Sequence, residues 1–196
     1  MEQTQIDHFG DALYLAMRER RMLAPLTETH PELTIEDAYA ISLRFLANRM
    51  QAGEKLVGKK IGVTSNAAMD MLGVRQPDFG FITDAMRYDE EMAISGALIQ
   101  PRAEGEIAFL LSKDLQGPGV TNDDVLAATD AVMPCFEVVD SRVKDWQIKI
   151  QDTIADNASC GWFALNEAAA VDPAAVDLVN CGMTVRKNGS VISTGT

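Results

Sequence analysis

The stretch Gln100-Pro-Arg-Ala-Glu-Gly-Glu-Ile-Ala-Phe-Leu-Leu111 decides how the rest of this chain is interpreted. Its apolar end predicts a β-strand, and Pro101 stands near the start of that strand. Because alternate side chains of a strand share a face, Glu104 and Glu106 are expected to point the same way. Two carboxylates held that close repel each other unless one is protonated or a cation lies between them.

A third acid belongs to the apolar run Ala131-Val-Met-Pro-Cys-Phe-Glu-Val-Val139, which is expected to be mostly buried. A buried Glu137 is costly unless it is paired or bound to a metal ion. Three carboxylates on two strands suit a hard, oxygen-preferring cation such as Mg²⁺. The alternative for the Glu-x-Glu pair by itself is a solvated edge strand, since acidic residues are commonly exposed.

Composition narrows the classes of function. The chain has 196 residues, of which 47% are hydrophobic, and a formal net charge of −12. It is large enough for one domain with its own core. Without a basic cluster, nucleic acid and anionic membranes are poor partners. A polar, acidic N-terminus and the lack of an apolar run of about 20 residues predict neither a signal peptide nor a membrane span.

The reactive residue types narrow the chemistry. Cys135, Cys160 and Cys181 are scattered without a CxxC motif, which predicts reduced thiols in a cytoplasmic protein. His8 and His30 are the two histidines of the chain, and both stand in its N-terminal segment. A zinc site or a Ser-His-Asp triad in the core is therefore not expected. Carboxylates, lysine and hydroxyls remain as the groups that can carry chemistry.

Residues 1–55 are expected to form a helical segment. Apolar residues recur at three- and four-residue spacing from Ile6 to Arg21. Thr34-Ile-Glu-Asp37 predicts a capping box that opens a second helix, which should run to about Met50 and stop before Gly53. This part is interpreted as a scaffold.

Residues 56–196 are expected to form a mixed, mostly β core, so the fold class is α+β. Leu56–Thr64 predicts a glycine-rich strand with Lys60, Gly62 and Thr64 on one face, where a ligand could approach the backbone closely. Taken alone, Lys60 fits a surface charge better than a site residue, and Asp78 alone fits a common Pro-Asp turn. Ser65 is expected to cap a short helix over residues 66–72, and Gln76–Gly80 to form a turn before an apolar, lid-like segment.

Further loops, a helix and a hairpin are expected later in the chain. Tyr88–Met92 is expected to be an acidic loop, and a helix is expected to run from Thr121 through about Ala131. Asp152–Cys160 is dense in small polar groups and fits either a ligand-binding loop or a tight structural turn. Asn188-Gly189 predicts the type I′ turn of a hairpin.

Five stretches together resemble the 2-hydroxypenta-2,4-dienoate (2-oxopent-4-enoate) hydratases of aromatic meta-cleavage pathways. These enzymes belong to the hydratase/decarboxylase family of the fumarylacetoacetate hydrolase-like superfamily. The resemblance runs from the first helix to the hairpin, in the family's order and spacing. The stretches that carry it are Gly58-Lys-Lys-Ile-Gly-Val-Thr-Ser65, Leu72-Gly-Val-Arg-Gln-Pro-Asp-Phe-Gly80, Ala103-Glu-Gly-Glu-Ile-Ala108, Phe136-Glu-Val-Val-Asp-Ser-Arg142 and Ala155-Asp-Asn-Ala-Ser159.

The resemblance implies roles for particular residues. It implies that a divalent metal, Mg²⁺ or Mn²⁺, is bound by Glu104, Glu106 and Glu137. The family's active-site lysine and aspartate fall on Lys60 and Asp78. Its polar substrate-binding loop falls on three further residues, Asp156, Asn157 and Ser159.

The resemblance also implies an activity and partners. The activity is metal-dependent hydration of 2-hydroxypenta-2,4-dienoate to 4-hydroxy-2-oxopentanoate, by a homo-oligomer that associates with 4-oxalocrotonate decarboxylase. Two alternatives stay open: 4-oxalocrotonate decarboxylase activity on the same fold, and a non-catalytic binding subunit. Family members continue past the hairpin, so a chain ending at Thr196 is expected to be incomplete at its C-terminus relative to the family.

Overall fold

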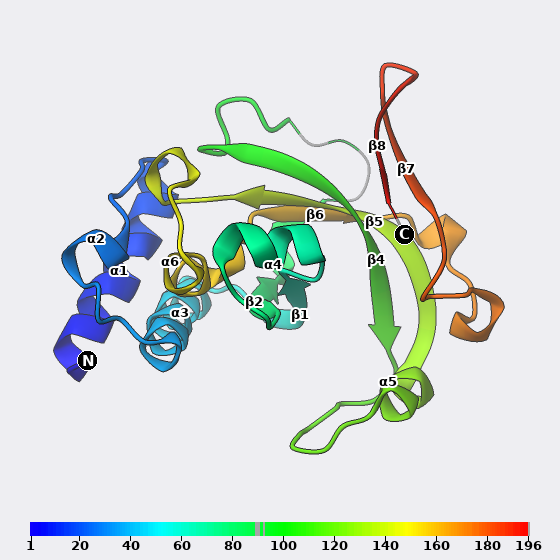
Figure 1. The fold of residues 1–196 in the computed structure, drawn as a ribbon, viewed down its shortest axis with the longest axis horizontal. Coiled ribbons are helices and arrows are strands. Elements are labelled where there is room, and N and C mark those ends of the chain that lie inside the picture. The colour runs from blue at the N-terminus through cyan, green and yellow to red at the C-terminus, as the bar shows by residue number, and fades with distance from the viewer. Residues whose placement is uncertain (89–90, 92, 196) are drawn as a thin grey trace. The chain divides into compact units, whose positions relative to one another are not determined.

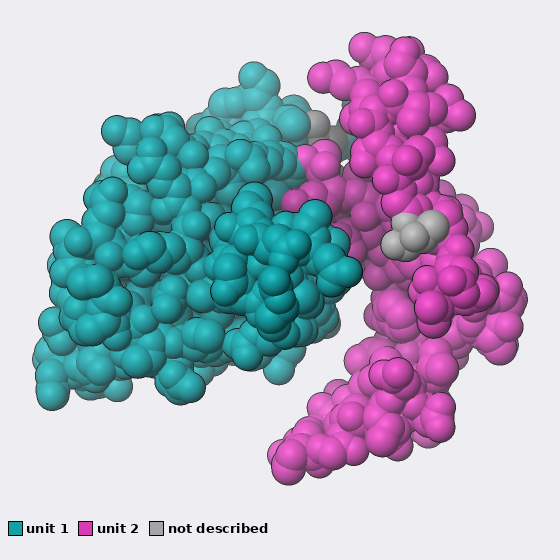
Figure 2. Space-filling view, viewed as in Figure 1, with its two compact units in different colours: residues 1–102, 138–162 teal, residues 103–137, 163–196 magenta. Residues whose placement is uncertain are grey.

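A computed structural model describes residues 1–88, 91 and 93–195 of the chain. The chain folds as two compact units, shown in different colours in Figure 2. Unit 1 comprises residues 1–102 and 138–162, and unit 2 comprises residues 103–137 and 163–196. The division predicted after residue 55 stays a prediction, whereas the α+β class is confirmed by the elements described below.

The first layer of unit 1 is helical and confirms the predicted scaffold. Helices α1 (Gln3–Glu19) and α3 (Ile35–Gln51) pack side by side, with the short α2 (Leu26–Thr29) between them in the chain (Figure 1). Thr34 accepts a hydrogen bond from the backbone N–H of Asp37, whose carboxylate accepts from the Thr34 N–H in return, so the predicted capping box is present. Gly53 follows α3 with φ +101°, a conformation that favours glycine.

The core of unit 1 forms where these helices meet α6 (Ile150–Ala155). Its centre is apolar and almost fully buried. Leu13 of α1, Phe45 of α3 and Ile154 of α6 are each at most 1% exposed. Burying side chains of this size contributes about 1.5–3 kcal/mol each, so the helices hold the backbone that follows them in a fixed place.

A two-stranded antiparallel ribbon comes next, built from β1 (Leu56–Gly62) and β2 (Asp78–Thr83). Helix α4 (Asn66–Leu72) connects the two strands, with Ser65 as its N-cap and Gly73 as its left-handed C-cap, as predicted. The expectation of a lid-like segment after Gly80 is wrong. This segment pairs with β1 along its length, and Phe81 and Thr83 of β2 are buried.

A four-stranded sheet has the order β3-β6-β5-β4. The strands are β3 (Arg87–Tyr88), β4 (Pro101–Leu111), β5 (Thr129–Asp140) and β6 (Trp162–Leu165). The predicted strands around the glutamates are therefore confirmed. Of the predicted acidic loop Tyr88–Met92, residues 89, 90 and 92 lie outside the described part of the chain.

Two expectations in unit 2 had different outcomes. The helix predicted through about Ala131 is shorter: α5 (Asn122–Ala128) ends where the β-branched Thr129 begins β5. The predicted hairpin is present as β7 (Met183–Lys187) and β8 (Ser190–Gly195), with Asn188 at φ +50° and Gly189 at φ +83°.

Short 3₁₀ turns complete the described chain, namely η1 (Asp84–Met86), η2 (Lys144–Trp146), η3 (Asn157–Ser159), η4 (Glu167–Ala169) and η5 (Pro173–Ala175). All three cysteines are free thiols, as predicted. Within the described residues, none of the helices combines the length and the apolar character that a bilayer span requires.

Candidate active site

Glu104 and Glu106 lie on β4 with Gly105 between them, as the sequence predicted. A Cβ atom added to Gly105 would lie 2.6 Å from Met183 Sδ and 3.1 Å from Val185 Cγ2, so this face of β4 packs directly against β7. Because side chains alternate along a strand, Glu104 and Glu106 face the opposite side. Gly105 thus gives the hairpin room on one face while the other face carries both acids.

Glu137 lies on β5, next to β4 in the sheet, and is 8% exposed. Cys135 stands two residues earlier on the same face of the strand. Burial and, to a smaller extent, the charges of Glu106 and Glu137 together raise the pKa of the Cys135 thiol to about 12. Both carboxylates therefore lie near one thiol, which stays protonated and uncharged at neutral pH.

This donor set fits a hard divalent cation, because the nearby groups are carboxylates and a neutral thiol rather than thiolates or imidazoles. Among the described residues, no group of three or more His, Cys, Asp or Glu side chains is gathered closely enough to hold a metal ion. The three-carboxylate site of Glu104, Glu106 and Glu137 therefore stays a prediction.

Lys60 and Asp78 come together on the β1–β2 ribbon of unit 1. Gly62 pairs with Asp78 and Lys60 pairs with Gly80, so these four residues share one face of the ribbon. A Cβ atom on Gly62 would overlap Asp78 Oδ1 and lie 3.4 Å from Lys60 Nζ. Both charged groups thus lie over the bare backbone of Gly62. The approach of a ligand to this face stays a prediction.

The Asp78 carboxyl is buried, with 3% of the residue exposed. Burial raises its pKa, while Lys60 and the backbone N–H groups of Asp78 and Gly62 act in the opposite direction. A carboxyl group with a raised pKa takes up a proton more readily than an exposed aspartate does, which favours a role in proton transfer. This environment therefore suits a carboxyl that exchanges a proton better than one that serves only as an ion-pair partner of Lys60.

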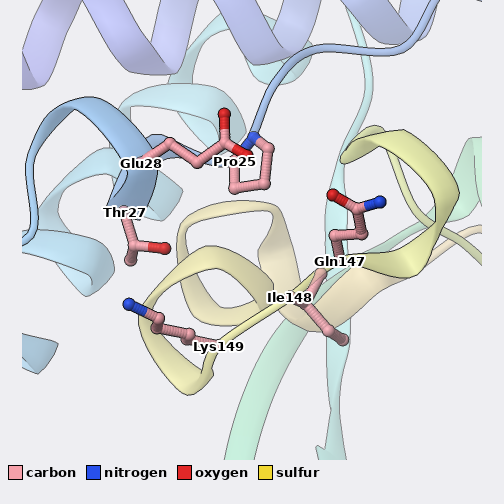
Figure 3. Close-up of a pocket in the computed structure, with 6 residues that line it drawn as sticks. All are labelled: Pro25, Thr27, Glu28, Gln147, Ile148 and Lys149. Carbon is pink, nitrogen blue, oxygen red and sulfur yellow. The ribbon is translucent and has the colours of Figure 1, made fainter.

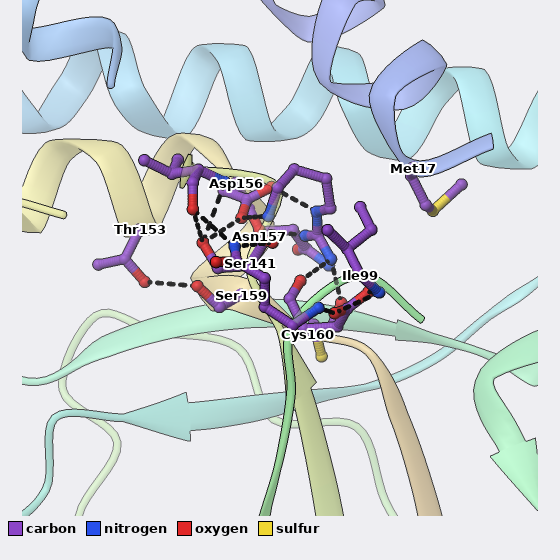
Figure 4. A network of polar contacts seen from close by, with 12 residues as sticks. Met17, Ile99, Ser141, Thr153, Asp156, Asn157, Ser159 and Cys160 are labelled. Carbon is purple, nitrogen blue, oxygen red and sulfur yellow. Dashed lines mark hydrogen bonds and ion pairs between the residues drawn. The ribbon is translucent and has the colours of Figure 1, made fainter. Parts of the chain in front are cut away.

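The predicted polar loop, Asp156 to Ser159, follows α6 and is buried. Figure 4 shows its residues in a network of polar contacts. Asp156 Oδ1 accepts a hydrogen bond of 2.5 Å from Arg142 Nε, and its Oδ2 accepts one of 2.8 Å from the Arg142 backbone. Asn157 bonds through both side-chain polar atoms to the backbone of Phe81. Ser159 Oγ lies 3.3 Å from Thr153 Oγ1. Substrate binding by Asp156, Asn157 and Ser159 stays a prediction.

Arg142 had no predicted role, although it ends one of the stretches that carry the resemblance. It is 1% exposed, and its guanidinium also donates to the carbonyls of Asp140, Asp156 and Cys160. Asp140, in turn, accepts from the backbone N–H groups of Ile99 and Gln100 just before β4. The sequence signal was available: Asp-Ser-Arg directly after a buried strand is a charged group that needs partners.

A shallow pocket of about 320 Å³ lies elsewhere in unit 1 (Figure 3). It is open to solvent and contains none of the predicted site residues. Its lining consists of Pro25, Thr27, Glu28, Gln147, Ile148 and Lys149. The chemistry described above does not involve this pocket.

Comparison with known proteins gives close relatives. The chain is 64% identical over 197 residues to a 2-hydroxypent-2,4-dienoate hydratase of Pseudomonas putida, covering 100% of this chain and 88% of that protein. It is 59% identical over 193 residues to a 2-hydroxyhexa-2,4-dienoate hydratase of Comamonas testosteroni, covering 97% of this chain and 73% of the relative. No protein-family model matches the chain.

Solved structures agree with the fold. The 4-oxalocrotonate decarboxylase of Pseudomonas putida G7, complexed with magnesium and adipate, superposes with a TM-score of 0.93 at 32% identity. The same enzyme complexed with calcium and acetate gives a TM-score of 0.91 at 32% identity. Each alignment covers 100% of this chain and 74% of the decarboxylase chain. The chain belongs to the 2-hydroxypenta-2,4-dienoate (2-keto-4-pentenoate) hydratase family, on the fumarylacetoacetate hydrolase-like fold that it shares with 4-oxalocrotonate decarboxylase.

Proposed function

We propose that this protein is a hydro-lyase that adds water to 2-hydroxypenta-2,4-dienoate, in a reaction that depends on a divalent metal ion and forms 4-hydroxy-2-oxopentanoate. The observation that carries the proposal is the 64% identity to a hydratase named for this substrate, over the full length of the chain. The pairing of Lys60 with a buried Asp78 over Gly62 supports it from the structure.

The metal ion is assigned to the carboxylates of Glu104, Glu106 and Glu137. The solved decarboxylase relatives carry magnesium or calcium, which supports a divalent cation of the hard class. Mg²⁺ or Mn²⁺ is our proposal for the working ion. When bound, the ion would supply Lewis acidity to the carboxylate and 2-oxygen of the substrate.

The reaction requires four proton movements. The 2-hydroxyl loses its proton and C5 gains one, which converts the dienol into a 2-oxo-3-enoate. The oxygen of water then bonds to the electrophilic C4 as the water loses one proton, and C3 receives a proton to complete the product. We assign to Lys60 the stabilisation of negative charge on the 2-oxygen. Asp78 is the group that holds and returns the proton along the carbon chain.

The polar loop is assigned to the substrate side of the site, with Asp156, Asn157 and Ser159 fixing the polar end of the substrate directly or through the backbone they hold. We further propose that the protein works in the cytoplasm as a homo-oligomer and that it associates with 4-oxalocrotonate decarboxylase. The three free thiols support the cytoplasmic location. The exposed apolar residues of unit 2, such as Phe109 and Phe136, support association with other chains. Light scattering of the protein alone and mixed with the decarboxylase tests both kinds of association.

The test of activity uses two substrates. Purified protein is incubated with 2-hydroxypenta-2,4-dienoate and, separately, with 4-oxalocrotonate, each with Mg²⁺ and after chelation. We expect loss of dienoate absorbance with Mg²⁺ and no release of carbon dioxide. Carbon dioxide from 4-oxalocrotonate would favour decarboxylation, and no turnover of either compound would favour a binding subunit.

A matched pair of variants tests the metal assignment. Glu106→Gln removes one carboxylate from the predicted metal set, while Asp114→Asn removes one negative charge from an exposed loop of the same unit. We expect Glu106→Gln to lose most metal-dependent activity and to bind Mg²⁺ more weakly by calorimetry. Equal activity of the two variants would contradict the assignment of Glu106.

A further inference from the structure

The side chain of Asn157 pairs with β2 as a neighbouring strand would. The Phe81 N–H donates to Asn157 Oδ1 at 2.7 Å, and Asn157 Nδ2 donates to the Phe81 carbonyl at 2.9 Å. Strand β1 covers one edge of β2, and the β1–β2 sheet has two strands. The Asn157 amide therefore satisfies both backbone groups of a buried residue on the other edge of β2.

Gly80 allows this contact. A Cβ atom on Gly80 would lie 2.5 Å from the Asn157 carbonyl oxygen and 3.2 Å from Ala158 Cβ. Any residue with a side chain would push the loop away from β2, since backbone at this distance cannot rotate aside. The strand and the loop thus fit together through a glycine and an amide side chain.

The loop itself is held in an unfavourable conformation. Asn157, Ala158 and Ser159 have φ of +55°, +50° and +53°, and the left-handed region costs roughly 1–2 kcal/mol for each L-residue. Arg142 compensates from behind the loop through its bonds to the carboxylate and carbonyl of Asp156. The buried ion pair thus stabilises a strained turn, and this turn places Asn157 against β2. Strain kept in this way indicates that the position of β2 has a functional role.

Asp78 is the residue whose position depends on this contact. It stands three residues before Phe81 on the same strand, directly across from Gly62 of β1. Its carboxyl lies over Gly62 with Lys60 Nζ close by, so a small shift of β2 changes all of these contacts together.

We propose that Asn157 is a positioning residue for the reaction: by pairing with Phe81 it fixes β2, and thereby sets the Asp78 carboxyl against Lys60 and Gly62. The inference rests on the proposed function, because it takes Asp78 as the group that moves the proton. It gives Asn157 a role that requires no contact with substrate, since its amide oxygen and nitrogen both already bond to Phe81.

The first test compares Asn157→Ala with Thr153→Val. Asn157→Ala deletes both bonds to Phe81, whereas Thr153→Val removes a buried hydroxyl that bonds to Ser159 in the same loop and leaves both bonds to Phe81 in place. For Asn157→Ala we expect kcat to fall by about 10²-fold, the scale of a 1 Å misplacement, while KM changes little. Thr153→Val should keep kcat even if it lowers the melting temperature. A higher KM with unchanged kcat in Asn157→Ala would overturn the inference and indicate a substrate contact.

The second test approaches the same contact from the strand. Gly80→Ala pushes the loop away from β2 and deletes no functional group. We expect it to lower kcat as Asn157→Ala does. We expect the double variant to have the same kcat as the less active of the two single variants, because both substitutions act through one contact. Multiplied losses in the double variant would show independent effects and overturn the inference. Gly80→Ala also serves where Asn157→Ala fails to fold.

A readout without turnover separates the inference from the proposed function. Carbon-13 NMR follows the titration of the Asp78 carboxyl in the wild type and in each variant. Because burial is the main cause of its raised pKa, loosening β2 should lower that pKa toward the ordinary value in Asn157→Ala and leave it unchanged in Thr153→Val. An inactive wild type that shows this difference would refute the hydratase function and keep the positioning role. An unchanged titration in Asn157→Ala would refute the positioning role.

Discussion

Replacing Gly62 by alanine should damage catalysis while leaving the fold intact. A Cβ atom at this position would overlap Asp78 Oδ1 and lie 3.4 Å from Lys60 Nζ. The Asp78 side chain is short and buried, so it cannot rotate into solvent to avoid the clash. The carboxyl or the strand must therefore shift by about 1 Å, and a misplacement of that size costs about 10²-fold in rate.

Gly58→Ala provides the matched control. Gly58 lies on the same strand and, four residues from Gly62, on the same face, yet a Cβ atom there has no heavy atom within 4 Å. Both variants exchange strand glycine for alanine, which by itself stabilises by roughly 0.5–1 kcal/mol. We expect Gly58→Ala to keep wild-type kcat/KM for hydration, and Gly62→Ala to lose about 10²-fold. Circular dichroism and thermal melting confirm that both fold. Equal kcat/KM in the two variants would refute the placement of Asp78 over Gly62.

Three further predictions concern Ser42, Lys60 and Arg142. Ser42 Oγ is buried and has no hydrogen-bond partner within the described residues, so Ser42→Ala should raise the free energy of unfolding in urea by about 1 kcal/mol; a clear loss would contradict this. Lys60 lowers the pKa of Asp78, so Lys60→Met should cut kcat by about 10²–10³ and move the acidic limb of its pH profile to higher pH; an unmoved limb would count against the pair. Arg142→Met should cost about 3–5 kcal/mol of stability. Burial already raises the pKa of Asp156 to about 6, above its unfolded value, so stability falls as pH rises toward 6. Without the opposing Arg142 charge this fall should continue above pH 6, widening the gap between variant and wild type; a gap that narrows there would contradict the pairing.

Local signals in the sequence predicted much of the fold. The capping box at Thr34, the cap at Ser65 and the Asn188-Gly189 turn each depend on neighbouring residues and were present as predicted. Two predictions were wrong. The helix expected to run to about Ala131 ends at Ala128, and the segment expected to be lid-like after Gly80 belongs to strand β2. Both are decided by pairing with distant strands, because sheet formation overrides local preference where the partner buries the segment.

The candidate site was predictable to a similar limit. The alternation of Glu104 and Glu106 on one strand and the bare face around Lys60 follow from the period of a strand, and the structure has both features. What the sequence could not supply was which face of Gly105 meets the hairpin, or that Cys135 of β5 lies near Glu106 of β4. These facts depend on the register between strands far apart in the chain.

The polar loop after α6 shows why composition alone left two interpretations open. A segment dense in Asp, Asn and Ser can present hydrogen bonds to a ligand or satisfy the backbone around it, and both need the same residue types. Burial decides what each side chain does in this structure: Asp156 and Asn157 are at most 1% exposed, and their polar atoms meet Arg142 and Phe81. Groups used in this way still act on chemistry when the strand they fix carries a proton-transfer residue. A residue type that matches a family's site can therefore support catalysis through the backbone, and the stretch of chain that it holds is the feature to measure.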